Sequence, residues 1–426
     1  MKLQQRPGKW IRSVLVLSFG WFLLYAARTV LSVTLKDIAD YWSLSETFLG
    51  LLSSGFFMAY TALQIPTGFL ADRFGSKRVL LTGFGLQSLA VLLSGFAVNQ
   101  QQFLITRVMG GAGQATYFAC QFAIISNIVP PERKAFGNSA SVAGSALGTG
   151  LGMIFGRLLS GTFLGWRLPF GVLGIISVLF VAAIIREVPE PRKPEVTGAV
   201  CPGPARHGLG GSNPASTSWV FLTCFSITHF LSMYGFYLML TWLPYYLETI
   251  RGFDQSLAAI IPVVMPFAMA PSTILGGYVS DRTGSKSLVV NICLPVSAIA
   301  TMAIPMMNSV AGLVLLLAVY GATGKLVIDP GLISYVTESA PVESRGTILA
   351  IFNFAGALAM AVAPAVTGYV AEVTGSFDPS FFMAGAFNIL ALGFFIAGAR
   401  LFSKSGIKGK SGFGTSGKSV SRARSM

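Results

Sequence analysis

Charged residues are scarce in this chain. Asp, Glu, Lys and Arg make up 11% of its 426 residues, and 53% are hydrophobic, whereas a water-soluble protein carries about 25% charged residues. So few polar side chains cannot cover a globule in water. The lipid bilayer must therefore be the solvent, and the backbone is expected to be almost entirely helical, because helices satisfy their own hydrogen bonds in lipid.

Cysteine and histidine are also few. The chain has two histidines, too few for a typical zinc site, and its four cysteines show no C-x-x-C spacing. We therefore expect no disulfide framework, no metal and no cofactor. The polar residues also offer no set of nucleophile, base and acid, so an enzyme is not indicated.

The apolar runs define the domain organisation. A spanning helix needs about 20 apolar residues, and by this measure twelve spans are predicted: 11–34, 46–70, 79–98, 102–128, 136–162, 168–186, 218–247, 255–279, 288–307, 310–338, 346–371 and 380–402. Residues 1–186 and 218–402 each hold six spans. Between them lies a linker rich in Pro and Gly, 187–217, and a tail predicted to be disordered follows at 403–426.

The distribution of Lys and Arg predicts the orientation. Of the 30, 23 lie in the termini, the linker and the loops after even-numbered spans, three lie in the opposite loops, and four lie inside spans. This spread over short loops argues against nucleic-acid binding. Both termini and the linker are therefore expected on the cytoplasmic side of the cell (inner or plasma) membrane.

A charged loop occurs twice. Residues Gly68–Arg78 and Gly277–Lys286 share the pattern G-x-x-x-D-R-x-G-x-K, 209 residues apart, and a second landmark, Pro131 and Pro341, repeats after 210 residues. Two landmarks at nearly one spacing indicate a duplicated membrane unit.

These features together resemble the major facilitator superfamily. The resemblance covers twelve spans, a central linker, and the charged loop after span two with its second-half copy. It implies an all-α membrane protein of two pseudo-symmetric six-helix bundles, in which spans one, four, seven and ten line a central cavity.

The resemblance also implies a role for the charged loops. In this superfamily such loops latch the cytoplasmic side, and Gly75 permits the sharp turn because it has no side chain. The alternative is that the basic residues only follow the positive-inside rule, but that rule does not account for a repeated Asp. The gate residues implied are Gly68, Asp72, Arg73, Gly75, Lys77, Arg78, Asp281 and Arg282.

Charges inside the spans are the candidate binding residues, since burying one costs about 2.5–3.5 kcal/mol on insertion scales. On span one, Arg28 shares a helical face with Tyr25, which suits capture of a carboxylate or phosphate. On span four, Arg107 shares a face with Gln114. The alternatives are snorkelling to the outer surface for either arginine, or a structural ion pair for Arg107.

Span ten holds Lys325 and, one turn later, Asp329, the only acid deep in a span. Pro330-Gly331 is expected to interrupt the helix there, as in helices that bind substrates near the midplane. A Lys–Asp pair that merely stabilises a kink is equally open. His229, on span seven, is a further candidate for the cavity, with a hydrogen-bonded role in the bundle as the alternative.

Span five carries Gly144, Gly148, Gly152 and Gly156, a ladder for close helix packing. Arg157, which follows it, is expected to be structural.

A finer resemblance is to the anion:cation symporter family. It rests on Arg28-x-x-Leu31-Ser32, on the stretch Ser54–Tyr60 with Gln64-Ile65-Pro66, on Arg107, and on Asn353, which joins the binding candidates. Proton-driven members commonly carry acids where this chain has Ala27 and Gln114. The usual proton relay is therefore missing, and either Asp329 substitutes or one anion is exchanged for another.

The predicted function is a secondary transporter of small organic anions, carboxylates first, that works by alternating access in the bilayer. The candidate cations exceed the acids, which favours an anion. A proton or a counter-transported anion is the expected partner, and a monomer is expected. Two alternatives stay open: an exporter of amphipathic compounds, which span five's glycines resemble, and a sensor that binds ligand without moving it.

Overall fold

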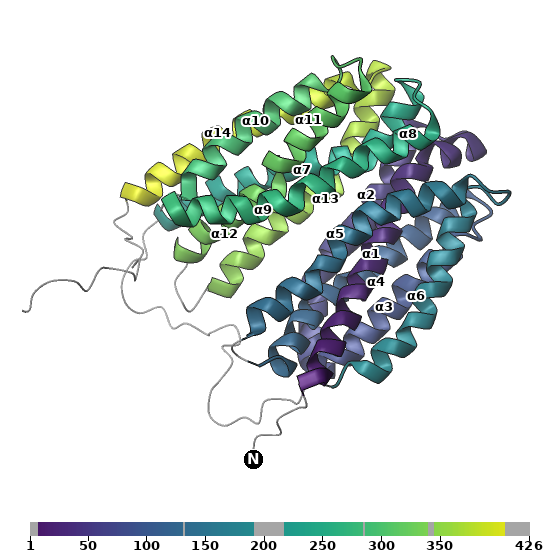
Figure 1. Ribbon diagram of the computed structural model, residues 1–426, viewed down its shortest axis with the longest axis horizontal. Coiled ribbons are helices and arrows are strands. Elements are labelled where there is room, and N and C mark those ends of the chain that lie inside the picture. The colour runs from purple at the N-terminus through teal and green to yellow at the C-terminus, as the bar shows by residue number, and fades with distance from the viewer. Residues whose placement is uncertain (1–6, 131–132, 191–216, 284–285, 340–344, 405–426) are drawn as a thin grey trace, which may run out of the picture.

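The computed structural model describes residues 7–130, 133–190, 217–283, 286–339 and 345–404. Within these ranges the chain is helical and contains no strand. Figure 1 shows two groups of helices side by side, one from each half of the sequence. Seven of the described helices are long and apolar enough to cross a membrane, and the all-α membrane fold expected from composition is confirmed.

The first bundle contains the six predicted spans as continuous helices. Polar caps begin two of them: Ser45 accepts a hydrogen bond from the N–H of Phe48, and Asn99 accepts one from Gln102. The helices are α1 (Pro7–Trp42), α2 (Glu46–Phe74), α3 (Ser76–Ser94), α4 (Gln100–Ile128), α5 (Lys134–Ser160) and α6 (Arg167–Glu187).

The second bundle contains two broken spans. Span eight is divided into α8, a short 3₁₀ turn and α9, and span ten into α11 and α12. The elements are α7 (Thr217–Thr249), α8 (Gln255–Ile260), η2 (Ile261–Val263), α9 (Val264–Thr283), α10 (Lys286–Ala303), α11 (Val310–Thr323), α12 (Lys325–Ser339), α13 (Arg345–Thr374) and α14 (Asp378–Lys404).

The predicted interruption at Pro330-Gly331 is wrong, because α12 runs through both residues. The break lies earlier, at Gly324, whose backbone is extended (φ −80°, ψ −156°). A proline in the second turn of a helix that begins at Lys325 removes a single hydrogen bond. The glycine before it offers the less costly place to break the span.

Parts of the predicted linker and tail, residues 191–216 and 405–426, lie outside the described residues. The domain boundaries and the disorder of the tail therefore stay predictions.

The glycine ladder of α5 packs directly on α1, as its spacing predicted. A Cβ at Gly148 would lie 2.3 Å from the carbonyl oxygen of Phe22, and one at Gly152 would lie 2.4 Å from Oγ1 of Thr29. Only glycine allows two helix backbones to approach so closely. The ladder thereby fixes the position of α1, which carries Arg28.

The two bundles are in contact along α2 and α13 at the end of the molecule away from the termini. There the N–H of Thr47 donates to the Glu372 carboxylate (3.0 Å). Further along the pair, Thr61 Oγ1 donates to the carbonyl of Ala357 (3.2 Å). Beyond these residues the helices separate around a cavity of about 540 Å³, and in Figure 1 the bundles diverge toward the end with the N-terminus.

Candidate functional site

Arg28 lies in an aromatic box built by α1 and α2. Its residue is 7% exposed, so the guanidinium does not snorkel to a surface. The guanidinium carbon lies 4.6 to 5.5 Å from the centroids of four rings, those of Tyr25, Phe56, Phe57 and Tyr60. Such faces stabilise a cation and exclude water without neutralising the charge.

Arg107, on α4, contacts one ring of the same aromatic box. It is 4% exposed, and its guanidinium carbon lies 4.7 Å from the Phe56 centroid, against 5.5 Å for Arg28. The two positive charges therefore contact the same phenyl ring. Snorkelling is excluded for this residue as well.

Neither arginine forms an ion pair with a carboxylate in the described part of the chain, where the ion pairs join other residues. Arg28 Nε donates to the amide oxygen of Gln114 (2.9 Å), while Arg28 Nη2 and Arg107 Nε have no protein partner there. Both arginines are therefore buried cations with donors that no described protein group satisfies.

The polar face of α4 continues beyond Gln114. Gln121 accepts hydrogen bonds from Trp21 Nε1 (3.1 Å) and from the Ser141 hydroxyl, so it ties α4 to α1 and α5. Tyr117 donates to the carbonyl of Leu17 (2.8 Å). These contacts hold α1 and α4 in register, and with them the two arginines.

Asn353 lies away from the arginine pair, on the wall of the 540 Å³ cavity between α2, α4 and α13. The same cavity is lined by Gln64, Gly68, Asp72 and Phe118. The structure thus brings Asn353 together with two of the predicted gate residues, at the end of the molecule that carries the termini.

The charged loop after α2 turns at Gly75, whose φ of +95° suits glycine. Lys77 Nζ donates to the carbonyl of Ile185 at the end of α6 (2.9 Å), and Arg73 lies over Phe74. Arg78 is exposed on the next helix, α3. These basic residues contact their own bundle.

Each of the two charged loops carries one Asp, Asp72 in the first and Asp281 in the second. Asp72 is exposed and makes no ion pair within the described residues. In the second-half loop Arg282 donates to Tyr278 (3.3 Å), while the Asp281 side chain lies outside those described.

His229 and Asp329 meet between α7 and α12. Nδ1 of the ring lies 3.4 Å from Oδ1 of the carboxylate, and the ring stacks on Phe352 of α13 with centroids 4.3 Å apart. The Lys325 side chain lies outside those described, so the predicted Lys–Asp pair stays a prediction. The described partner of Asp329 is a histidine in the same bundle.

Arg157 is a structural residue in its contacts, as expected. Its Nη1 lies 3.6 Å from Asp37 of α1, and its Nη2 donates to Gln255 of α8 in the other bundle. It joins the bundles at the end away from the termini.

The sequence analysis places Tyr25 at the site but not the rings of α2. Phe56 and Tyr60 belong to a motif there, and their spacing of four places both on one face of a helix. That signal could have marked the face of α2 that meets Arg28.

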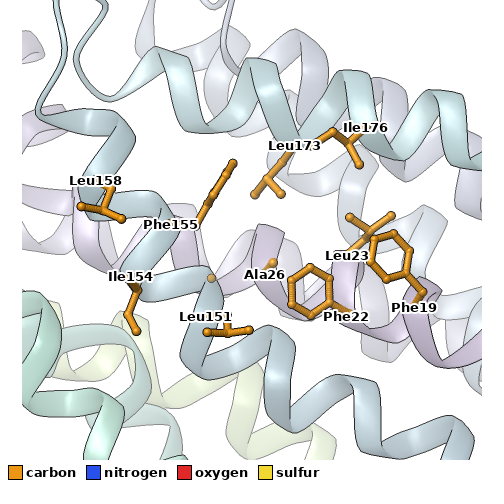
Figure 2. Close-up of a pocket in the computed structure, with 11 residues that line it drawn as sticks. Phe19, Phe22, Leu23, Ala26, Leu151, Ile154, Phe155, Leu158, Leu173 and Ile176 are labelled. Atoms are coloured by element: carbon orange, nitrogen blue, oxygen red, sulfur yellow. The ribbon is translucent and has the colours of Figure 1, made fainter.

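A second cavity is entirely different in character. Figure 2 shows aliphatic and phenyl side chains of α1, α5 and α6 around a space of about 340 Å³, among them Phe22, Phe155 and Leu173. No charged side chain lines it. It offers nothing that would hold an anion.

Comparison with known proteins places this architecture. The sequence matches the Major Facilitator Superfamily over residues 17–364 and 225–422. The chain belongs to this superfamily. Like its relatives in the superfamily, it is a membrane transporter and not an enzyme.

Two superfamily relatives are similar over most of their length. A probable sulfoacetate transporter of Cupriavidus necator is 28% identical over 393 residues, covering 87% of this chain and 89% of the relative. A probable galactarate/D-glucarate transporter of Bacillus subtilis is 27% identical over 420 residues, covering 88% of this chain and 90% of the relative.

The fold also matches a solved superfamily structure, that of a bacterial homolog of the human lysosomal transporter Spinster. The TM-score is 0.81 at 18% identity, covering 94% of this chain and 99% of that one. At this identity the match shows the fold alone.

Proposed function

We propose that this protein is a secondary active transporter of small organic dianions, dicarboxylates foremost. The observation that carries the proposal is the pair Arg28 and Arg107, both buried within 5.5 Å of the Phe56 ring centroid and without a described carboxylate partner. Two uncompensated buried cations are costly. A substrate with two anionic groups would neutralise both.

The N–H groups of Arg28 and Arg107 that have no protein partner suggest how each residue of the site would act. Arg28 Nη2 and Arg107 Nε would donate to the anionic groups, since each lacks a protein partner. Gln114 holds the Arg28 guanidinium through Nε. Tyr25 and the other rings keep water out, so that the electrostatic attraction is strong. Asn353 would contact the substrate on its way through the cavity.

The relatives support the class of substrate. The two relatives described above are named as probable transporters of sulfoacetate and of galactarate or D-glucarate, which are small molecules with two anionic groups each. The arginine pair of this chain matches that charge.

Alternating access fits the arrangement of the bundles. The contacts of α2 with α13 close one end, and the 540 Å³ cavity opens toward the end of the termini. With the termini on the cytoplasmic side of the cell membrane, as the basic residues predict, this is an inward-open state. Asp72, exposed and without an ion pair here, would pair with a basic residue when that side closes.

The test is a counterflow assay in proteoliposomes loaded with unlabelled galactarate, sulfoacetate, phosphate or D-xylose. Labelled galactarate outside is the probe. We expect uptake into vesicles loaded with galactarate or sulfoacetate and none into vesicles loaded with D-xylose. No uptake with either dianion would overturn the proposal, and binding of galactarate without counterflow would favour the sensor.

An exporter of amphipathic compounds makes a different prediction. It would tolerate Arg28→Ala, because its substrates need no buried cation. Loss of galactarate counterflow in that variant, with the folded protein retained, would count against an exporter.

A further inference from the structure

We propose that His229 and Asp329 form the proton-binding site that couples transport, in the second bundle rather than the first. A dianion that enters a cell against an inside-negative potential needs a coupled driving force, since each charge costs about 2.3 kcal/mol per 100 mV. Beside the buried arginines of the first bundle, Ala27 and Gln114 do not titrate.

The geometry of the pair suits one shared proton. His229 is 4% exposed, and its Nδ1 lies 3.4 Å from Asp329 Oδ1. Neither atom has a hydrogen-bond partner within the described residues. A proton from water that binds either atom would join the two in a hydrogen bond and change the charge of the pair from −1 to zero.

Two residues of α13 pack closely on the imidazole ring of His229. Phe352 stacks on one face at an interplanar angle of 19°. A Cβ at Gly356 would lie 2.2 Å from the ring's Nε2, so only glycine leaves room for the imidazole at this place. Asp329 is the more exposed partner, with its side chain 15% exposed, so a proton would reach the pair from its side.

Within the described ranges, no other ion pair involves His229 or Asp329. On α13 no ionisable side chain lies between Arg345 and Tyr369, on α14 none lies between Asp378 and Arg400, and neither α8 nor η2 has any. On α1, Arg28 makes its described contacts within the first bundle.

On α12 itself, Lys325 lies one turn before Asp329, and its side chain is outside those described. It is the one further charge that the test must separate from the pair.

The pair is also placed to act on the cavity. Phe352, which the imidazole contacts, is followed directly by Asn353 on the cavity wall. Both belong to α13, the helix that holds the bundles together through α2. A change in the charge of the pair would therefore act on the helix that must move between the two states.

The chain makes a direct test possible, because it has only two histidines, His207 and His229. In a His207→Gln protein in lipid nanodiscs, ¹⁵N-histidine NMR reports His229 alone. We expect the His229 signals to change with pH in one protonation step. In Asp329→Asn the midpoint should move to lower pH by about one pH unit or more, because the nearby anion is gone.

The controls separate the pair from other charges. Asp254→Asn, which removes an acid but keeps a capping residue on α8, should leave the midpoint unchanged, and Lys325→Met should move it less than Asp329→Asn does. A ring that does not titrate, or one that ignores Asp329→Asn, would overturn the proposal. This arm needs no substrate and so does not depend on the proposed function.

The transport arm rests on the proposed function and uses galactarate as the probe. Wild-type and His207→Gln vesicles with an alkaline interior should accumulate galactarate above its external concentration. His229→Gln and Asp329→Asn should still show counterflow but no accumulation driven by the pH gradient. Full accumulation in both variants would refute the coupling role, whereas absence of counterflow in every protein would refute the transport proposal instead.

Discussion

Arg28 donates its Nε hydrogen to the amide oxygen of Gln114 over 2.9 Å. A neutral amide thus occupies the place next to the guanidinium where a carboxylate would neutralise it. Gln114→Glu should introduce such a carboxylate with little change in shape. We expect galactarate affinity to fall by about tenfold or more, because the new charge competes with the substrate for Arg28.

The same variant should make counterflow depend on pH, with the affinity recovering as pH falls and the new Glu is protonated. Gln101→Glu, an exposed position on α4, adds the same charge about 20 Å along the helix from Gln114 and should change neither property. Equal affinities for wild type and Gln114→Glu at neutral pH would show that Arg28 is not a substrate ligand.

A lysine should not replace Arg28. Arg28→Lys keeps the charge but loses the fork that donates to Gln114 and to a substrate at once. We expect galactarate counterflow to fall at least about tenfold in Arg28→Lys and to vanish in Arg28→Ala. Thermal unfolding in detergent serves as the check that both variants are folded; counterflow at the wild-type rate in Arg28→Ala would contradict the site.

Lys325 begins α12 directly after the break at Gly324. As the one Lys or Arg within spans seven and ten, it is predicted to act on the anion, so Lys325→Ala should abolish counterflow while the protein stays folded. Counterflow initial rates measure this. Counterflow at the wild-type rate in Lys325→Ala would show that Lys325 does not act on the anion.

The glycine ladder predicts a stability effect without a charge change. Gly148→Ala places a Cβ 2.3 Å from the backbone oxygen of Phe22, which cannot move aside as a side chain could. We expect a loss of about 1–3 kcal/mol and a lower unfolding temperature. Gly171→Ala on α6, where no atom lies within 4 Å of the new Cβ, is the matched control and should unfold like the wild type.

Gly356→Ala tests the second bundle in a similar way. The added methyl group collides with the imidazole of His229 and should push it from Asp329, although no ionisable group is removed. Accumulation of galactarate in a pH gradient should fall more than counterflow does. Gly393→Ala, which meets open space on α14, should leave both rates intact; equal losses in the two variants would speak against the pair.

Much of the fold could be predicted because its causes are local in the sequence. Scarce charge requires a bilayer, apolar length marks each span, and the spacing of Gly148 and its neighbours predicts a close helix contact. Arg28 stands out in the same way, as a charge in an apolar helix. The break of span ten was misplaced because Pro330 is the stronger local signal, whereas Gly324 breaks at lower cost.

The candidate site was harder to predict because its contacts join distant segments. Phe56 meets Arg28 and Arg107 across three helices, and no periodicity along the chain relates the three. His229 and Asp329 lie on different helices, and the residues next to each in the sequence do not indicate that the two side chains meet. Only the packing of α7, α12 and α13 brings the imidazole and the carboxylate together.

The most direct test of the account is a series of substrates that differ only in charge. Galactarate, galactonate and galactitol share one six-carbon chain and carry two, one and no carboxylates. In proteoliposomes loaded with each, the account predicts rapid uptake of labelled galactarate against galactarate, slower uptake against galactonate, and none against galactitol. Uptake against galactitol as fast as against galactarate would contradict the claim that the buried arginine pair selects a dianion.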